Sequence, residues 1–305
     1  MAAYLAQRLG QSALVVFGIS AAVFVLVFLS GDPTALMVPP DATADQVAQF
    51  RRAMGFDRPL AEQYLRFLER LTRGNLGVSL RHEQPALDLV LERIPATLHL
   101  AAAALATSLL IAVPLGVLSA TRRDSLYDHL GRVLALVGQS VPTFWLGIML
   151  ILFAAVRWRW FPASGYEGVE YLVLPAVTLG AYSAAVTMRL LRSSLIEVLG
   201  RDYIRTARAK GLGGRAILFR HALKNAGIPV VTVLGLQIGT LMGGAMVTET
   251  VFAYPGMGLL AIQAVRNRDF PVVQAFVITV GAVIVLANLL VDLAYTYLDP
   301  RIRYR

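Results

Sequence analysis

Residues 197–230 read EVLGRDYIRTARAKGLGGRAILFRHALKNAGIPV, a polar and basic stretch that lies between two strongly apolar segments. Its periodicity predicts two amphipathic helices. We expect the first helix to be capped by Asp202 and ended by Gly211, and the second to cover residues 215–226. The break between them, Gly-Leu-Gly-Gly at residues 211–214, predicts a protruding knob rather than a flat surface.

Each predicted helix has an apolar face and a polar face. On the first helix, Tyr203, Ile204 and Ala207 lie opposite Arg201, Arg205 and Arg208. On the second, the apolar stripe is Leu218, Phe219, Ala222, Leu223 and Ala226, the polar stripe is Arg220, His221, Lys224 and Asn225, and Ile217 breaks the pattern on the polar side. Such helices either lie among lipid headgroups or form a docking surface, and the sharp break favours docking.

Outside this stretch the chain has the composition of a membrane protein, with 57% hydrophobic residues. Six apolar runs are long enough to cross a hydrocarbon core of about 30 Å as helices. They cover residues 12–30, 96–120, 133–156, 172–190, 226–248 and 275–298. Pro114, Pro142 and Pro175 lie inside the second, third and fourth runs and predict kinks there. The expected fold class is therefore an all-α, polytopic membrane protein with six transmembrane helices.

Several kinds of chemistry are excluded by the residues themselves. The chain has no cysteine, and its four histidines, His82, His99, His129 and His221, are too scattered for a zinc site. No Gly-x-x-x-x-Gly-Lys-Ser/Thr motif occurs, so the chain has no P-loop of its own. We therefore expect no catalytic residue, no metal site and no cofactor bound by this chain, which is not an enzyme.

The distribution of charge predicts the orientation in the membrane. Sixteen of the 28 basic residues, but only five of the 19 acidic residues, fall on the side that holds both termini and residues 197–230. The positive-inside rule places that side in the cytoplasm. The basic balance of +9 is thus a topology signal, and it does not indicate nucleic-acid binding. We read the first run as an uncleaved signal anchor in a multi-pass cell (inner) membrane protein.

Residues 31–95 form a long segment on the opposite, extracytoplasmic side. Tyr64, Phe67, Leu68 and Leu71 recur at helical spacing, which predicts a cap of short amphipathic helices. This cap either packs only on the bundle or docks a partner. The predicted organisation is an N-terminal transmembrane helix at 1–30, this segment at 31–95, a core at 96–298 and a cytoplasmic tail at 299–305.

The fifth apolar run carries regularly spaced glycines together with several polar residues. Gly235, Gly239 and Gly243 repeat every four residues, which predicts close packing with another helix. Gln237, Thr240 and, at the end of the run, Glu249 are candidates for a substrate pathway, and interhelical hydrogen bonds are the alternative. In the sixth run, Asp292 shares a face with Asn288, and a structural ion pair with Arg301 or Arg303 is its favoured interpretation.

The basic stretch resembles the cytoplasmic "EAA" loop of binding-protein-dependent ABC importer permeases, in the version found in dipeptide, oligopeptide, nickel and glutathione permeases. The resemblance rests on TARAKG at 206–211, RHALKNA at 220–226 and IPV at 228–230, although Arg205 and Thr206 stand where Glu and Ala are usual, and Lys224 where Pro is usual. It continues in GDP at 31–33, GFDRPL at 55–60, GNLGVS at 74–79, VFAYPGMG at 251–258 and LDPRIRY at 298–304. These motifs in this order resemble the first of the two permease subunits in such systems.

The resemblance implies a type I ABC importer permease fold with a cytoplasmic coupling helix in the loop at 194–227. The partners it implies are a second, homologous permease, two ABC ATPase subunits that bind ATP and Mg, an extracytoplasmic substrate-binding protein, and membrane lipid. The residues it implies for ATPase coupling are Arg205, Thr206, Ala207, Arg208, Lys210, Gly211, Leu212, Phe219 and His221.

The expected function is therefore the transmembrane path of an ATP-driven importer for short peptides or a related small solute. Dipeptides, longer peptides, glutathione, nickel complexes and opine-like solutes all stay open as cargo. A secondary, ion-coupled transporter is one alternative, but no clear internal repeat is present and Asp292 is the single acid well inside a run. A structural subunit of a larger membrane complex is another.

Overall fold

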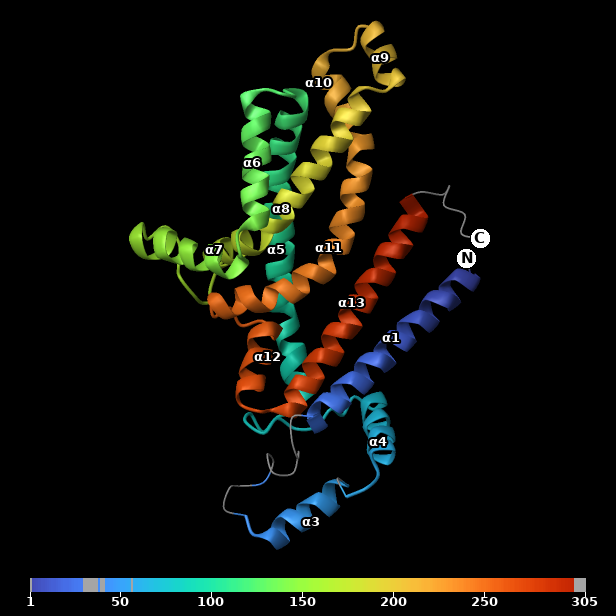
Figure 1. Cartoon of the computed structure of the whole chain (residues 1–305), viewed down its shortest axis with the longest axis vertical. Helices are drawn as coiled ribbons and strands as arrows, with labels where there is room; N and C mark the ends of the chain where they lie inside the picture. Colours follow the sequence, from blue (N-terminus) through green and yellow to red (C-terminus); the bar gives the residue numbers. More distant parts are fainter. Residues whose placement is uncertain (1, 30–37, 39–41, 56, 299–305) are drawn as a thin grey trace. The chain divides into compact units, whose positions relative to one another are not determined.

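A computed structural model describes residues 2–29, 38, 42–55 and 57–298, without the side chains of residues 2–9, 26–29, 50, 53, 54, 238, 240, 244 and 290–298. The regular elements in these ranges are all helices, and one isolated bridge joins Val78 to Pro85 (Figure 1). The predicted all-α fold class is confirmed.

The chain divides into two compact units. Unit 1 combines Met1–Pro95 with Leu259–Arg305, and unit 2 is Ala96–Gly258. Both boundaries fall inside helices, the first in α5 (Ala86–Thr121) and the second in α12 (Met257–Arg266).

In unit 1, α1 (Ala2–Leu29) packs along α13 (Phe270–Leu298), and the short helices α3 (Ala44–Met54) and α4 (Leu60–Thr72) follow α1 in the chain (Figure 1). The approach of α13 to α1 is close, because a Cβ on Gly281 would lie 2.6 Å from Cδ1 of Ile19. On α4, the Tyr64 ring lies 5.2 Å from that of Phe24, and its hydroxyl lies 2.9 Å from Ser20 Oγ. The aromatic residues predicted to form one face of a helix in this segment thus attach α4 to α1.

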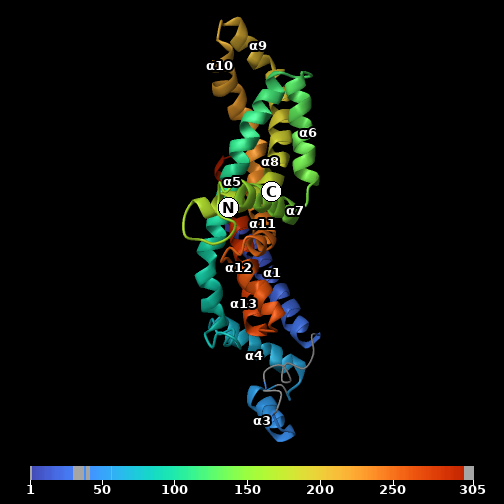
Figure 2. The ribbon, with the colours of Figure 1, turned by 90° about the vertical axis from the view of Figure 1, so that its left-hand side faces the viewer.

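Unit 2 is built around α8 (Glu170–Leu199), which contacts α6 (Leu126–Ser140), α7 (Thr143–Leu150) and α11 (Leu223–Val251) (Figure 2). Gly180 allows α8 to lie directly against α5, since a Cβ there would come 2.6 Å from the Ala104 carbonyl oxygen. The remaining elements are π-helical η1 (Ile151–Arg157), α9 (Asp202–Ala209), α10 (Gly214–Ala216) and π-helical η2 (Ile217–Ala222). The side chains of α8 supply much of the buried core of this unit.

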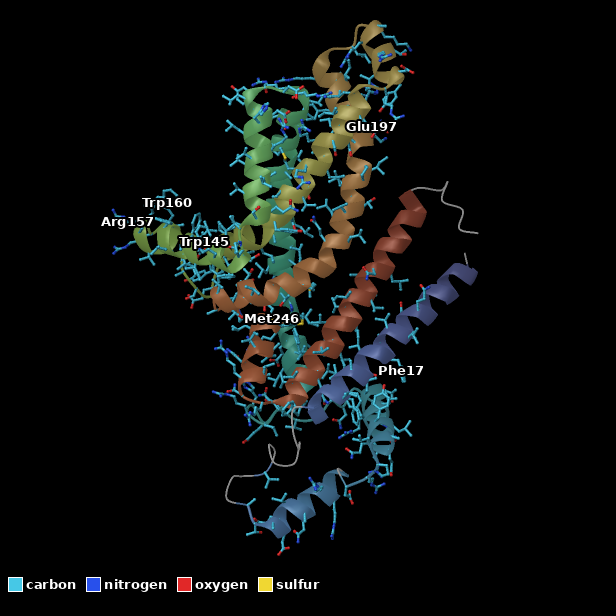
Figure 3. All side chains as sticks on the ribbon, in the orientation of Figure 1. Phe17, Trp145, Arg157, Trp160, Glu197 and Met246 are labelled. Atoms are coloured by element: carbon cyan, nitrogen blue, oxygen red, sulfur yellow. The ribbon has the colours of Figure 1, made fainter. Side chains whose placement is uncertain are left out.

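The single helix expected at 133–156 is wrong. Helix α6 ends at Ser140, and α7 with η1 leaves it at an angle of 103°. The cause is Pro142, which has φ −61° and lacks an N–H, and which drives Val141 into an extended conformation (φ −75°, ψ 125°). Pro175, by contrast, lies inside α8 as expected. The arm formed by α7 and η1 covers Thr143–Arg157. Trp145 and Arg157 lie along it, and Trp160, whose ring stacks on that of Trp158, follows it (Figure 3).

The described residues contain fewer stretches that meet the criteria for a membrane span than the expected six. Four helical stretches in the described residues are long and apolar enough to cross a membrane, namely Ala86–Thr121, Glu170–Leu199, Gly214–Gly243 and Phe270–Leu289. The bent pair of α6 with α7 and η1 makes a fifth if it counts as one span. Helix α1 has 28 residues, but its described side chains, Gly10–Val25, form a shorter apolar stretch. Six separate spans are therefore not confirmed.

Candidate functional site

The centre of the basic stretch is a glycine turn, which we define as residues 211–214, between α9 and α10. Gly211 has φ +78°, a conformation that glycine adopts without the steric cost of a Cβ, and its N–H donates to the Arg208 carbonyl at 2.9 Å. A Cβ on Gly211, Gly213 or Gly214 would meet no atom within 4 Å. The glycine turn therefore protrudes from the chain, as its sequence predicted.

The start of α9 differs from the prediction. Arg201, not Asp202, occupies the N-cap position, and no side chain caps the helix. Asp202 lies in the first turn, where its carboxylate accepts from Arg205 Nη1 at 3.3 Å. A negative charge at this end of a helix interacts favourably with the helix dipole.

One face of α9 fixes it to the rest of unit 2. Ile204 is fully buried and Ala207 is nearly so, and both pack with Leu195 of α8 and with Ile217 and Ala222 of η2. Tyr203, expected on the same face, is instead exposed. Ala207 is thus an internal contact that orients α9, and it is not part of the surface that a partner would meet.

The remaining proposed coupling residues lie at the surface. Arg205, Thr206, Arg208, Lys210, Gly211, Leu212 and Phe219 are exposed, and His221 is half-buried. The ion pairs on this surface, Arg201 with Glu197 and Arg205 with Asp202, are both exposed and therefore weak. Figure 3 labels Glu197 close to the end of α8, where α9 follows. The outward face of α9 is a positively charged surface whose cations are available to acidic groups.

The second predicted helix does not exist as a separate element. The chain is helical without interruption from α10 through η2 into α11, so residues 215–226 are the first turns of the helix that carries the fifth apolar run (Figure 1). A displacement of the glycine turn therefore acts directly on that long helix.

The π-helical turn also corrects the predicted faces. In η2 the hydrogen bonds span five residues, so Ile217 and Ala222 share one face, and both are buried. Phe219, assigned to the apolar stripe, is 61% exposed. Ile217 broke the expected pattern because the pattern assumed 3.6 residues per turn throughout.

The three proposed pathway residues have different environments. Gln237 is buried on α11, while the side chain of Thr240 lies outside the described residues. Glu249 is fully buried near the end of α11, where Oε1 accepts from Thr97 Oγ1 at 2.6 Å and Oε2 accepts from the Gly258 N–H at 2.7 Å. With these two hydrogen bonds, the Glu249 carboxylate fixes the turn that follows α11.

The turn that Glu249 holds is residues 252–256, which separate α11 from α12. Thr97 Oγ1 also accepts from the Met257 N–H at 2.9 Å, so α5 and the start of α12 share one network with Glu249. Gly256 is required there, because a Cβ would collide with the Glu249 carboxylate. Tyr254 in this turn is buried, and burial raises the pKa of its phenol above the ordinary value. The sequence at residues 251–258 carries a family resemblance, but nothing in it indicates this hydrogen-bonded role.

The predicted glycine face of α11 is only partly covered by this chain. Gly235 and Gly239 are half-buried. Gly243 is exposed, and a Cβ there would meet no atom within 4 Å. Asp292, the ionisable residue of the sixth run, and its suggested partners Arg301 and Arg303 have side chains outside the described residues.

Sequence reasoning missed a buried ion pair near the ends of α5, α6 and α8. Asp128 has no exposed surface, and Arg192 donates to it in a bidentate manner at 2.6 and 2.7 Å. The Ser119 hydroxyl and the Asp124 N–H donate to the same carboxylate. In the sequence Asp128 is one acidic residue among several near the end of a run, and only the fold brings it to Arg192, 64 residues away in the chain.

Two family models match the chain. A model described as binding-protein-dependent transport system inner membrane component matches residues 112–304, and its N-terminal companion matches residues 1–101.

Curated relatives and solved structures agree with these models. The dipeptide transport system permease protein DppB of Escherichia coli (strain K12) is 39% identical, and the match covers all of both chains. The glutathione transport system permease protein GsiC of Escherichia coli O6:H1 is 38% identical over 99% of each chain. In fold, an inward-facing structure of the MetNI methionine ABC transporter matches with a TM-score of 0.59 and 19% identity, over 69% of this chain and 96% of that chain.

Proposed function

Because the chain belongs to the family of binding-protein-dependent transport system inner membrane components, we propose that it forms, with a second permease, a path for short peptides that a binding protein delivers. It is a multi-pass inner-membrane permease of an ATP-driven importer, of the peptide and glutathione type, and it works with other ABC components. Full-length relatives named as transport permeases do not favour a secondary transporter or a purely structural subunit.

The proposed partners are one homologous permease, two ATPase subunits and one extracytoplasmic binding protein. ATP and Mg would be bound by the ATPases, since this chain has no P-loop. In the proposed orientation both termini and the glycine turn face the cytoplasm, as the positive-inside rule predicts. Short peptides are favoured as cargo because several relatives are named as dipeptide or peptide permeases.

The observation that carries this proposal is the protruding glycine turn beside an α9 whose inner face is fixed. Ile204 and Ala207 hold α9 against α8 and η2, while Arg205, Arg208 and Lys210 point to solvent. A rigidly held, cationic projection suits a cleft on an ATPase. Because α10, η2 and α11 are continuous, closure of the ATPase pair would move the long helix directly.

Substitution of Gly211 tests the coupling role. Gly211→Asp adds a side chain and a negative charge to the tip, and we expect it to abolish uptake of the dipeptide Ala-Ala and copurification of the ATPases. Gly211→Asn adds a side chain with less backbone strain, because asparagine tolerates a positive φ better than other residues. It therefore separates the effect of side-chain bulk from that of backbone strain. We expect it to lose most ATPase copurification as well.

Gly227→Ala is the matched control, since this glycine also has open space around it but lies within α11. It should leave both uptake and copurification at the wild-type level. Membrane insertion of all three variants, checked by fractionation, should be normal. If Gly211→Asp retains the ATPases and uptake, the coupling assignment is wrong. If wild-type membranes yield neither an ATPase nor a second permease, the proposed function is wrong.

A further inference from the structure

Unit 1 contains a pocket that the function proposed so far does not use. Its volume is about 390 Å³, and it lies between the turn at residues 79–82 and the end of α12. The polar lining includes Arg81 and His82 from the turn, and Gln263, Arg266 and Asn267 from α12 and the residue after it.

The walls of this pocket are fixed by hydrogen bonds. Asp269 is 2% exposed and accepts from Ser79 Oγ at 2.5 Å and from the Leu80 N–H at 3.3 Å. Ser79 Oγ in turn accepts from the His82 N–H at 3.0 Å. Across the rim, Arg81 Nη1 donates to Asn267 Oδ1 at 3.0 Å. These hydrogen bonds therefore join the turn to the end of α12 and fix the backbone that carries the cationic side chains.

The pocket carries a surplus of positive charge. Arg81, His82 and Arg266 are exposed at its rim, and in the part of the chain that the structure describes neither arginine forms an ion pair. The one acidic residue in the lining, Asp269, is buried and already accepts two hydrogen bonds. A ligand that presented a carboxylate would thus meet cations whose charge is not already neutralised by a partner.

Membrane topology does not account for Arg266. In the proposed orientation, α12 belongs to a short extracytoplasmic connection between α11 and α13, and this connection holds Arg266 and Arg268. The positive-inside rule disfavours basic residues in short loops on that side. The positive-inside rule therefore does not explain Arg266, which is the one of these two arginines that lines the pocket.

We propose that this pocket receives an acidic side chain of the binding protein when that protein docks on the permease. This inference rests on the proposed function, and it adds the place and the chemistry of docking. Guanidinium groups bind carboxylates through paired hydrogen bonds, and a fixed rim lowers the entropy that docking costs. Charge complementarity at such a site also speeds association, and salt weakens it.

The test uses the whole transporter in lipid nanodiscs and the binding protein that copurifies with it, loaded with Ala-Ala. The variant is Arg81→Ala combined with Arg266→Ala. We expect about tenfold weaker binding, mainly through slower association, together with a shallower dependence on salt concentration. Arg266→Glu should weaken binding further, because it places a like charge opposite the acidic side chain.

Arg70→Ala is the matched control, because it removes an exposed arginine from α4 in the same outer segment, away from the pocket lining. Its binding should equal that of wild type. Unchanged affinity in the double variant, with normal assembly and basal ATPase activity, overturns the pocket proposal and leaves the permease function intact. The pocket proposal is also overturned if millimolar free Ala-Ala displaces the unloaded binding protein from wild type but not from the double variant. If wild-type complex captures no binding protein, the proposed function fails, and the docking proposal with it.

Discussion

Glu249 and Asp269 are buried carboxylates with similar surroundings. Each accepts one hydrogen bond from a hydroxyl group, Thr97 or Ser79, and one from a backbone N–H, Gly258 or Leu80. In both cases the carboxylate joins a turn to a neighbouring helix. Leaving such buried donors without an acceptor costs about 1–3 kcal/mol each, so each carboxylate stabilises the local backbone.

We expect Glu249→Ala to lower the free energy of unfolding by about 2 kcal/mol or more, since it leaves the Thr97 hydroxyl and the Gly258 N–H buried without this acceptor. The measurement is thermal unfolding of the purified protein in detergent. Thr250→Ala is the control, because the Thr250 hydroxyl donates to the Met246 carbonyl of its own helix, and it should change stability little. Equal stability of the two variants would contradict the role given to Glu249.

At the scale of the helices, η2 decides which side chains of the basic stretch face outward. Its wide turn places Ile217 inside and Phe219 outside, the reverse of what an ideal α-helical projection indicates. The one extra residue that each hydrogen bond spans in η2 therefore changes which residues a partner can meet.

Paired substitutions in η2 check this arrangement. Ile217→Asp puts an unpaired charge into the cluster around Ile204 and Ala222, so we expect poor folding and low yield from membranes. Phe219→Asp should fold normally and should reduce ATPase copurification instead. Normal yield of Ile217→Asp together with poor yield of Phe219→Asp would show that the helix has α-helical register here.

The buried Asp128–Arg192 pair connects α6 to α8 and gives a second prediction at this scale. Asp128→Asn leaves the Arg192 cation without its charge partner, and we expect a loss of about 3–5 kcal/mol in the free energy of unfolding. Glu197→Gln removes the acid of an exposed pair and should cost about 1 kcal/mol or less. Both losses are measured by thermal unfolding. Equal losses would contradict the expectation that the buried pair contributes more stability than the exposed pair.

Sequence reasoning succeeded where a property depends on local composition. Helical segments, the break at Gly211 and the amphipathic character of α4 and α9 all follow from spacing of three to four residues. It failed where distant residues decide the outcome. Nothing near Asp128 indicates Arg192, and nothing near Glu249 indicates Thr97. The sharp angle at Pro142 was read as a kink, because proline alone does not state whether a helix bends or ends.

At the scale of the whole molecule, the proposed orientation puts the glycine turn and the pocket on opposite sides of the membrane. In that proposal the glycine turn would face the ATPases, and the pocket at Arg81 and Arg266 would face the binding protein. Because the chain has no cysteine, single cysteines can report the side on which each region lies.

We expect Arg73→Cys, at the residue that follows α4, to react with a membrane-impermeant maleimide in cells whose outer membrane alone has been permeabilised. Gly213→Cys in the glycine turn should react only after the inner membrane is disrupted. Arg73 is 74% exposed, and Gly213 has open space around it, so both positions are accessible once the reagent reaches them. The cysteine-free parent is the control, and the reverse labelling pattern would invert the proposed topology.

The unbroken helix from α10 to α11 also restricts how this chain can vary in length. Each residue inserted or deleted within residues 214–251 would rotate everything beyond it by about 100°, and would turn Gln237 and Glu249 away from their neighbours. The alignment with the Escherichia coli dipeptide permease spans 338 positions against 305 residues here, so at least 33 of its positions have no residue in this chain. Those insertions should fall in connecting segments, such as residues 31–95, where added length turns no helix face.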